Sequence, residues 1–511
     1  MATMTKSKKR RASKSATSPA KDARRPYLGG ISDIRRWFHR NERPYYFVSA
    51  TNFNVLNMDT WVRNFRFINY VDCFDGRNPH IFIPKQKSHQ PFQSLEEINN
   101  YLLGHKEVVD YVKGRPPGGQ ALFLFFDEKT EQAARDVGLQ VAFPEARLRG
   151  IVGNKLDTVR IGNRAGVHSV PNVLAKVDSW KSLQRVSKRL GNDLVVQTAY
   201  GDSGHTTYFI KSKKDFDEHA KEITEAPEVK IMRRINCRSS AIEACVTRHG
   251  IIVGPLMTEL IGFPELTPYR GGWCGNEVFA GAFSQRIRDQ AREMVIKFGK
   301  EIRKLGYRGY FELDLLMDTE SGKVYLGECN PRITGASSMT NLAAFAHADA
   351  PLFLFHLLEF ADVDYDLNVD ELNARWADPK NIDPWSQLVM KHTADTVDRV
   401  TEAPPSGVWK MAPDGTVSFG YVQTHRRRVE NENEAFWLRI AGPGDWRYKG
   451  GDLGILLTPG RLMTDDFRLT ERARAWIRGM QAQYRGSLPN AAAPAPPPTP
   501  RAAEVGSFKI H

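Results

Sequence analysis

The 511-residue chain has no uninterrupted apolar run of about 18 residues, which is the length that a membrane-spanning helix needs. Its beginning also lacks the charged-then-apolar pattern of a secretory leader. We therefore expect a cytoplasmic protein without a membrane span. The apolar fraction of 41% is ordinary, and the length suffices for two or three domains with complete cores.

Cysteine is scarce, and the five cysteines lie far apart without the paired spacing of a zinc site. This distribution favours reduced thiols over a disulfide framework, and no cysteine has the setting of an obvious nucleophile. The residues are Cys73, Cys237, Cys245, Cys274 and Cys329.

Basic residues are abundant but unevenly distributed. Residues 1–25 carry nine Lys or Arg side chains and one Asp, so this segment supplies +8 of the formal net charge of +13. A Lys-, Ser- and Ala-rich arm of this kind is typical of a disordered tail. Contact with a polyanion or a membrane surface is the weaker interpretation.

Short apolar runs alternate with helical patterns after the arm. The runs predict buried strands at 45–50, 80–84, 121–126 and 139–143. Helix-spaced apolar residues predict helices over 95–112 and 130–138. This alternation indicates an α/β layer with a largely parallel sheet.

The last third of the chain has a different pattern. Beyond an acidic, turn-rich stretch at 362–383, strand-like segments punctuated by Gly and Pro predict an antiparallel β-rich domain, followed by a helix over 470–484. From residue 486 the Ala/Pro-rich sequence predicts an extended, disordered tail. The predicted divisions are a basic arm at 1–30, an α/β domain at 31–150, a central domain at 151–360, the β-rich domain at 361–485 and the tail at 486–511.

Acidic and amide side chains gather on one predicted hairpin of the central domain. Its first strand carries Glu312 and Asp314 two residues apart, so they share a face. Its return strand, 323–330, carries Glu328 and Asn330 on one face, and a register pairing Asp314 with Glu328 fits the five-residue loop. Facing carboxylates repel unless a cation lies between them, and oxygen ligands suit a Mg²⁺ ion that also binds phosphate. A solvated acidic face is the alternative.

The segment Glu328-Cys-Asn-Pro-Arg332, preceded by an acid on the neighbouring strand, resembles the pattern of the ATP-grasp superfamily. The resemblance implies that Asp314, Glu328 and Asn330 bind Mg²⁺, with Mn²⁺ as a substitute. It implies that Arg332 steadies an acyl-phosphate or carboxyphosphate intermediate. Glu312 is the alternative to Asp314 as a ligand. The implied fold class is α/β, an α+β ATP-grasp domain between an N-terminal α/β domain and a C-terminal β-rich domain, as in biotin carboxylases.

A second segment, 151–171, resembles biotin carboxylases and related ATP-grasp ligases. It has a Lys at the start of a helix that ends in Ala-Gly-Val before a Pro, which implies that Lys155 contacts the nucleotide. The following strand-loop-strand at 194–210 is similar to the lid loop of the superfamily. The loop residues that would turn backbone N–H groups toward phosphate are Gly201, Ser203 and Gly204.

One position departs from the family pattern. The phosphate-binding Lys that the family carries on the strand before the lid loop falls at Gln197. An amide can donate a hydrogen bond to phosphate but adds no charge, so we expect Arg233, Arg234 or His205 to compensate.

The strand at 229–235 resembles the adenine-contacting strand and hinge of the family. This implies ATP contacts from Met232, Arg233, Arg234 and Ile235, although core packing explains the apolar members equally well. Glu243 is a candidate pocket carboxylate.

The residues after Arg332 separate two kinds of ligase. Biotin carboxylases continue with a stretch whose Glu serves as the base for bicarbonate, and Ala336 lies at that place. Arg-x-Thr-Gly-Ala-Ser-Ser is more similar to the helix entry of carboxylate–amine ligases, in which Ser337 could receive an anionic substrate. Its hydroxyl could equally cap the helix. Arg270, in a Gly-rich loop with Trp273, is a second candidate for binding a carboxylate.

The leading hypothesis is therefore an ATP- and Mg²⁺-dependent ligase that joins a small-molecule carboxylate to an amine through an acyl phosphate. A biotin-carboxylase-like enzyme that makes carboxyphosphate is the alternative within the class. A non-catalytic nucleotide-binding or nucleic-acid-associated protein is the alternative from another class. A homodimer is the expected assembly. Lys391, in a faint likeness to a biotin-attachment sequence, is interpreted as a surface lysine.

Overall fold

The computed structural model describes residues 25–86, 92–200, 206–341 and 349–488. Most of the predicted arm and nearly all of the predicted tail lie outside the described residues. In the described part of the chain, no helix is both long and apolar enough to cross a bilayer.

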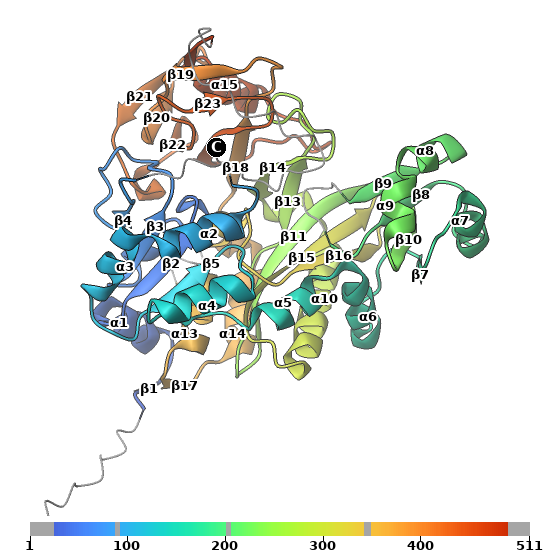
Figure 1. Ribbon diagram of the computed structural model, residues 1–511, viewed down its shortest axis with the longest axis horizontal. Helices are drawn as coiled ribbons and strands as arrows, with labels where there is room; N and C mark the ends of the chain where they lie inside the picture. Colours follow the sequence, from blue (N-terminus) through green and yellow to red (C-terminus); the bar gives the residue numbers. More distant parts are fainter. Residues whose placement is uncertain (1–24, 87–91, 201–205, 342–348, 489–511) are drawn as a thin grey trace, which may run out of the picture.

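The N-terminal region is an α/β layer, coloured blue in Figure 1. Its five parallel strands lie in the order β4-β3-β2-β5-β6, which confirms the predicted parallel sheet. The strands are β2 (Tyr45–Ser49), β3 (Phe65–Asn69), β4 (Ile81–Phe82), β5 (Gln120–Phe123) and β6 (Gln140–Val141). Strand β3 has no counterpart among the predicted strands, because Arg66 interrupts its apolar run.

The helices of this layer correct one prediction. The helix expected over 95–112 is two helices, α2 (Leu95–Gly104) and α3 (Lys106–Lys113). His105 lies between them in an extended conformation, and its ring Nδ1 accepts a hydrogen bond from the amide of Glu107. It therefore ends one helix and caps the next. Helices α1 (Ile31–Arg40) and α4 (Glu128–Asp136) belong to the same layer.

Two later helices also pack into the N-terminal core. They are α13 (Leu352–Phe360) and α14 (Val369–Ala377), and their apolar side chains join the core of the parallel sheet. Strand β1 (Tyr27–Leu28), inside the predicted arm, pairs with β17 (Asp364–Tyr365). Helix α14 and strand β17, which follow the boundary predicted at residue 360, therefore pack and pair with the N-terminal region. Strand β1, which precedes the boundary predicted at residue 30, takes part in the same strand pair.

An eleven-stranded sheet runs through the rest of the molecule in the order β16-β15-β11-β13-β14-β18-β24-β22-β20-β21, with β12 paired to β11. The central strands are β11 (Cys237–Val246), β12 (Ile251–Val253), β13 (Met257–Ile261), β14 (Trp273–Val278), β15 (Gly309–Asp318) and β16 (Val324–Asn330). The C-terminal strands are β18 (Trp385–Lys391), β20 (Gly407–Met411), β21 (Val417–Tyr421), β22 (Glu434–Arg439) and β24 (Asp452–Pro459). The antiparallel C-terminal strands confirm the predicted β-rich region, and the β14–β18 pair joins it directly to the central strands.

One face of the central strands is apolar and covered by helix α10 (Gln285–Lys304). Alternate residues of β15, namely Phe311, Leu313 and Leu315, are fully buried in the core that this helix shares. Because side chains alternate along a strand, Glu312 and Asp314 point to the opposite face. Burial of the apolar set thus fixes which way the acids point.

A smaller antiparallel sheet, in the order β7-β10-β8-β9, projects to the right in Figure 1 together with three helices. Its strands are β7 (Asn172–Ala175), β8 (Leu194–Gln197), β9 (Thr207–Ile210) and β10 (Val229–Arg233). Its helices are α7 (Trp180–Ser187), α8 (Lys213–Glu218) and α9 (Ala220–Glu225). Helices α5 (Ala146–Gly153) and α6 (Lys155–Ala165) lead into it from the N-terminal layer.

The C-terminal region is completed by a three-stranded sheet and a helix. The strands are β19 (Asp398–Glu402), β23 (Trp446–Arg447) and β25 (Arg485–Ser487), and the helix is α15 (Glu471–Gln481). Lys391, expected as a surface lysine, is instead buried at the end of β18, where its Nζ lies 2.5 Å from Oδ1 of Asp452. This pairing compensates the charge that the sheet buries.

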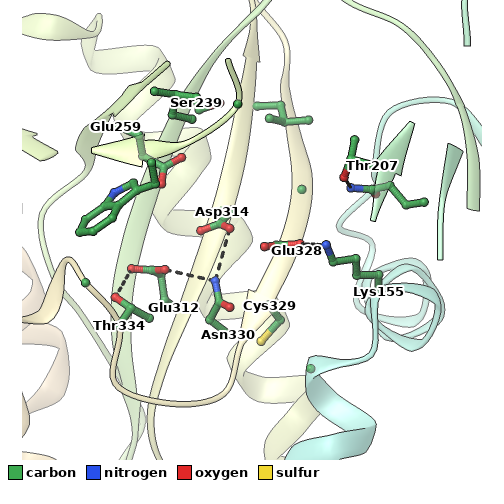
Figure 2. A pocket seen from close by; sticks show the side chains of 18 of the residues that line it. Lys155, Thr207, Ser239, Glu259, Glu312, Asp314, Glu328, Cys329, Asn330 and Thr334 are labelled. Carbon is green, nitrogen blue, oxygen red and sulfur yellow. Dashed lines mark hydrogen bonds and ion pairs between the residues drawn. The ribbon is translucent and has the colours of Figure 1, made fainter. Parts of the chain in front are cut away.

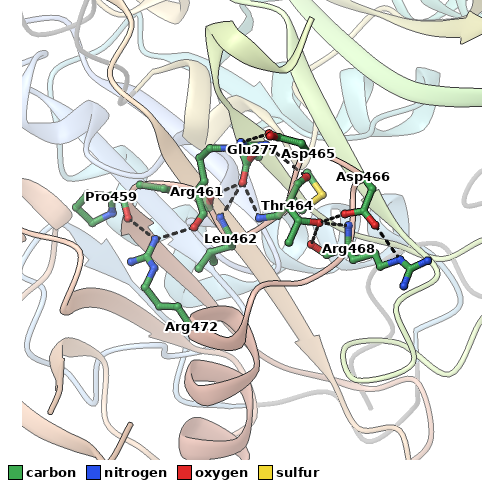
Figure 3. A network of polar contacts seen from close by, with 12 residues as sticks. Glu277, Pro459, Arg461, Leu462, Thr464, Asp465, Asp466, Arg468 and Arg472 are labelled. Atoms are coloured by element: carbon green, nitrogen blue, oxygen red, sulfur yellow. Dashed lines mark hydrogen bonds and ion pairs between the residues drawn. The ribbon is translucent and has the colours of Figure 1, made fainter. Parts of the chain in front are cut away.

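Glu277 on β14 anchors the turn that follows β24 (Figure 3). Its side chain is 1% exposed, and Oε2 accepts hydrogen bonds from the amides of Leu462 at 2.7 Å and Met463 at 3.0 Å. The guanidinium of Arg461 lies 3.2 Å from Oε1. These contacts hold the turn so that Phe467 reaches the large cavity described below.

The change Glu277→Gln should lower the free energy of unfolding by roughly 2–3 kcal/mol, because the neutral amide removes the charge that pairs with Arg461 and puts an NH2 donor in place of one of the two buried acceptor oxygens. Denaturant-induced unfolding measures the change. Glu293→Gln on the exposed face of α10 is the control and should stay within about 0.5 kcal/mol of the unchanged protein. Equal stability of the two variants would contradict the anchoring role.

Candidate active site

A cavity of about 1500 Å³ lies between the small sheet, the acidic face of the central sheet and the turn after β24. Ligand pockets in proteins commonly measure about 300–1,000 Å³. The cavity therefore has room for a nucleotide and a second substrate.

The acidic face depends on one extra residue in β16. Leu315 pairs with Leu326, but the preceding residue of β15, Asp314, pairs with Glu328. Gly327 therefore has no partner on β15 and forms a β-bulge. Strict alternation would place Leu326 and Glu328 on one face, although one is apolar and the other acidic. The bulge lets Leu326 join the core beneath α10 while Glu328 faces the cavity. The pairing of Asp314 with Glu328 confirms the predicted register.

Asn330 connects the acids of this face (Figure 2). Its Nδ2 donates hydrogen bonds to Oε1 of Glu312 at 3.2 Å and to Oδ2 of Asp314 at 3.3 Å. Burial, followed by the nearby charges of Glu312 and Glu328, raises the pKa of Asp314 well above its usual range. The protein alone therefore leaves repulsion between these acids unresolved.

The residues present fit a divalent cation. Oδ1 of Asp314 is buried and has no hydrogen-bond partner among the described residues, which is a costly state for a carboxylate oxygen unless a ligand occupies it. Glu328 adds carboxylate oxygens of the type that Mg²⁺ prefers. Asn330 would add its Oδ1 once the amide turns from the present arrangement, in which Nδ2 faces the acids and Oδ1 accepts a hydrogen bond from Arg332. Among the described residues, no three His, Cys, Asp or Glu side chains form a metal-binding group by themselves. A cation here would need the Asn330 amide, water or phosphate oxygens as further ligands.

Lys155 approaches the acids from the opposite wall. It is the first residue of α6, which Asn154 caps by accepting hydrogen bonds from the amides of Leu156 and Asp157. Its Nζ lies 3.0 Å from Oε2 of Glu328, as Figure 2 shows. Although burial alone would raise the pKa of Glu328, Lys155 lowers it below its usual value. The start of α6 thus holds the ammonium group of Lys155 in the cavity.

A second lysine in the cavity was not among the predicted residues. Lys230 on β10 pairs directly with Gln197 on β8, and it lines the cavity although it is only 1% exposed. Gln197 itself donates a hydrogen bond to Oγ1 of Thr207 on β9, at 3.0 Å. From the sequence, a Lys inside an apolar strand is expected to face solvent. Only the pairing of β8 with β10 shows that Lys230 lies beside Gln197 at the cavity.

Arg332 lines the cavity immediately after the acids. Its guanidinium donates to Oδ1 of Asn330 at 2.9 Å and to the carbonyl of Ile333 at 3.1 Å, and it lies 4.1 Å from the ring centroid of Phe125. Phe125 belongs to the N-terminal layer, so this layer helps to orient the arginine.

Glu243 and Ser337 lie behind the cavity wall rather than in it. Ser337 is fully buried, and its hydroxyl donates to Glu243 at 2.5 Å, while Tyr310 donates to the other oxygen of Glu243 at 2.5 Å. Thr334 bridges Glu243 and Glu312, at 2.9 and 2.7 Å. The structure thus corrects the prediction that Ser337 receives substrate, because its hydroxyl is committed to a buried carboxylate. It also places Glu243 as support for Glu312.

The remaining predicted residues divide into two groups. The first group lines the cavity and consists of Met232, Arg233, Arg234, Ile235 and Arg270. Of the candidates to compensate for Gln197, Arg233 donates to the carbonyl of Leu190 at 3.4 Å, and Arg234 lies 3.8 Å from Asp193. The second group lies outside the described residues and consists of Gly201, Ser203, Gly204 and His205.

Glu259 is a further cavity residue that the sequence did not indicate. It lies on β13, lines the cavity, and has no hydrogen-bond or ion-pair partner within the described residues. Burial, followed by the charges of Asp314 and Glu328, raises its pKa well above the usual range. Trp273 also lines the cavity, and its ring packs so closely on Gly335 that a Cβ at Gly335 would lie 2.3 Å from the ring.

Family comparison identifies the central part of the chain. Residues 152–336 match the model of the ATP-grasp domain, so the chain contains an ATP-grasp domain. The match covers the cavity residues from Lys155 to Ala336. No curated protein matches the chain significantly.

Solved structures extend the likeness to the N- and C-terminal regions. Biotin carboxylase from Campylobacter jejuni aligns with a TM-score of 0.58 and 12% identity, over 87% of this chain and 92% of that one. The biotin carboxylase domain of 2-oxoglutarate carboxylase from Hydrogenobacter thermophilus, crystallised with MgADP and bicarbonate, gives 0.54 and 13%, over 88% and 91%. Carboxyaminoimidazole ribonucleotide synthase from Aspergillus clavatus, complexed with ATP, gives 0.52 and 13%, over 86% and 99%. At these identities the likeness establishes the fold, which is that of ATP-grasp enzymes.

The buried acids predict a pH dependence of stability in the absence of metal. Burial, followed by the charge of Glu243, raises the pKa of Glu312 from 4.5 to about 8. The folded protein then binds this proton more tightly than the unfolded chain, so its contribution to stability falls as the pH rises from about 4.5 to about 8. Glu312→Gln should remove this part of the slope in chelator-treated protein, as measured by denaturant unfolding at several pH values. Identical slopes for both proteins would contradict the assignment.

Proposed function

We propose that the protein is an ATP- and Mg²⁺-dependent ligase that activates a small-molecule carboxylate as an acyl phosphate and transfers the acyl group to an amine. The observation that carries the proposal is the arrangement of Asp314, Glu328 and Asn330 opposite Lys155, with Arg332 beside them, in one cavity of an ATP-grasp fold.

Each cavity residue has a defined task in this reaction. Asp314, Glu328 and Asn330 would hold Mg²⁺, which when bound neutralises phosphate charge and orients the triphosphate. Lys155 binds phosphate oxygens through its ammonium group. The substrate carboxylate attacks the γ-phosphorus, so that one O–P bond forms, one breaks and ADP leaves. Arg332 stabilises the negative charge that this transfer places near the substrate.

The amine completes the reaction. It attacks the carbonyl carbon of the acyl phosphate, phosphate leaves, and a C–N bond replaces the C–O bond. Glu259 favours a cationic amine over an anionic acceptor, because an ammonium ion beside it would stabilise the ionised carboxylate that burial and the neighbouring acids otherwise disfavour. It can also accept the proton that the amine must lose before attack.

A biotin-carboxylase-like reaction is the second candidate, favoured by the likeness to two biotin carboxylase structures. Ala336 counts against it. The residue is buried at the cavity wall, where its methyl group cannot act as the base for bicarbonate. A homodimer, a cytoplasmic location and polyanion contact through the arm remain predictions.

Release of ADP should depend on both a carboxylic acid and an amine when the protein is supplied with MgATP and a panel of each. Amine dependence is expected because only the second step turns the acyl phosphate over. Phosphate release that needs bicarbonate and biotin would support the second candidate instead. Nucleotide binding without ADP formation across the whole panel would support a non-catalytic role.

Glu328→Gln should reduce this turnover by roughly 100-fold or more, because the metal contributes several kcal/mol to stabilisation of the transferred charge. Circular dichroism should be unchanged, since the amide keeps the size of the side chain. Glu293→Gln on α10 is the control for a neutralised acid elsewhere. Full activity of Glu328→Gln would rule out the metal assignment.

A further inference from the structure

Gln197 leaves the nucleotide cavity without the lysine that ATP-grasp enzymes carry on this strand, but the neighbouring strand carries one at the same level. Lys230 on β10 is the direct partner of Gln197 in the β8–β10 ladder. The Cβ atoms of cross-strand partners lie about 4.5–5.5 Å apart and point to the same face. Lys230 therefore places a positive charge on the strand next to the one where the family carries its lysine, at the same level of the sheet and on the same face.

The surroundings of Lys230 do not satisfy its ammonium group. The side chain is 1% exposed, and its one hydrogen-bond partner among the described residues is the carbonyl of Gly327, 3.2 Å from Nζ. An ammonium group has three donors. Since taking a cation out of water is costly, two unused donors at a cavity wall indicate that a ligand supplies the missing acceptors.

The position also fits the triphosphate. Lys230 contacts the carbonyl of Gly327, and Nζ of Lys155 lies 3.0 Å from Oε2 of the next residue, Glu328. Both lysines therefore approach the proposed metal ligands Asp314, Glu328 and Asn330 at Glu328. Arg233 and Arg234 also line the cavity, but their guanidinium groups already have other partners, the carbonyl of Leu190 for Arg233 and the carboxylate of Asp193 for Arg234.

We propose that Lys230 is a phosphate-binding residue, which supplies from β10 the charge that Gln197 lacks on β8. This inference rests on the proposed function for the identity of the ligand, ATP. The competing explanation is structural, in which Lys230 only ties the small sheet to β16 through the Gly327 carbonyl.

A charge swap separates the two explanations. Binding of the non-hydrolysable analogue AMPPNP with Mg²⁺, and of adenosine, is measured by calorimetry on the full chain. Lys230→Met should weaken AMPPNP binding by roughly 10- to 100-fold, the usual worth of a charge-assisted hydrogen bond, and leave adenosine binding within about 2-fold. Adding Gln197→Lys to this variant should recover most of the loss, because it returns an ammonium group to the partner position.

Lys211→Met, at an exposed site beyond β9, is the matched control and should bind AMPPNP like the unchanged protein. The inference is overturned if Lys230→Met binds AMPPNP normally, if it loses adenosine and AMPPNP equally, or if the added Gln197→Lys recovers nothing. Failure of the unchanged protein to bind AMPPNP at all would instead reject the proposed function.

Discussion

Negative charge buried on one face of the β15–β16 hairpin is the constraint around which the site is arranged. Four carboxylates, those of Glu243, Glu312, Asp314 and Glu328, lie on adjoining strands of this face, at ladder positions where like charges repel. The protein compensates unequally. Hydroxyl groups satisfy Glu243, and Lys155 satisfies Glu328, but one oxygen of Asp314 has no partner in the part of the chain that the structure describes. The uncompensated acid is therefore the position at which we propose that a ligand binds.

The cationic side chains that lie near these carboxylates come from separate parts of the chain. Lys155 arrives on a capped helix, Lys230 on the small sheet, and Arg332 on the loop that Phe125 of the N-terminal layer supports. The C-terminal strands contribute by continuing the same sheet through the β14–β18 pair, and Glu277 fixes the turn that carries Phe467 to the cavity. Four regions thus meet at one face, and burial of the opposite face against α10 keeps that face in register.

Much of this arrangement could be predicted from the sequence. The Asp314–Glu328 register followed from alternation and loop length, and the parallel N-terminal sheet followed from alternating strands and helices. The errors arose where a tertiary contact decides the outcome. Ser337 looked like a substrate residue because its buried partner, Glu243, lies 94 residues away. Lys391 looked exposed because its partner, Asp452, lies 61 residues further along the chain. The position of Lys230 at the cavity became evident only from the pairing of β8 with β10.

The bulge at Gly327 restricts how the length of this hairpin can change. A deletion of Gly327 would leave Leu326 and Glu328 on opposite faces, as they are now, and would remove only the carbonyl that receives Lys230. A deletion or insertion of one residue between Glu328 and Asn330 would instead turn one of these two side chains toward α10. Related chains can therefore lack Gly327 and still keep the acidic face. They cannot gain or lose a residue between Glu328 and Asn330 without losing it, so Glu328-Cys-Asn330 must be inherited as an uninterrupted unit.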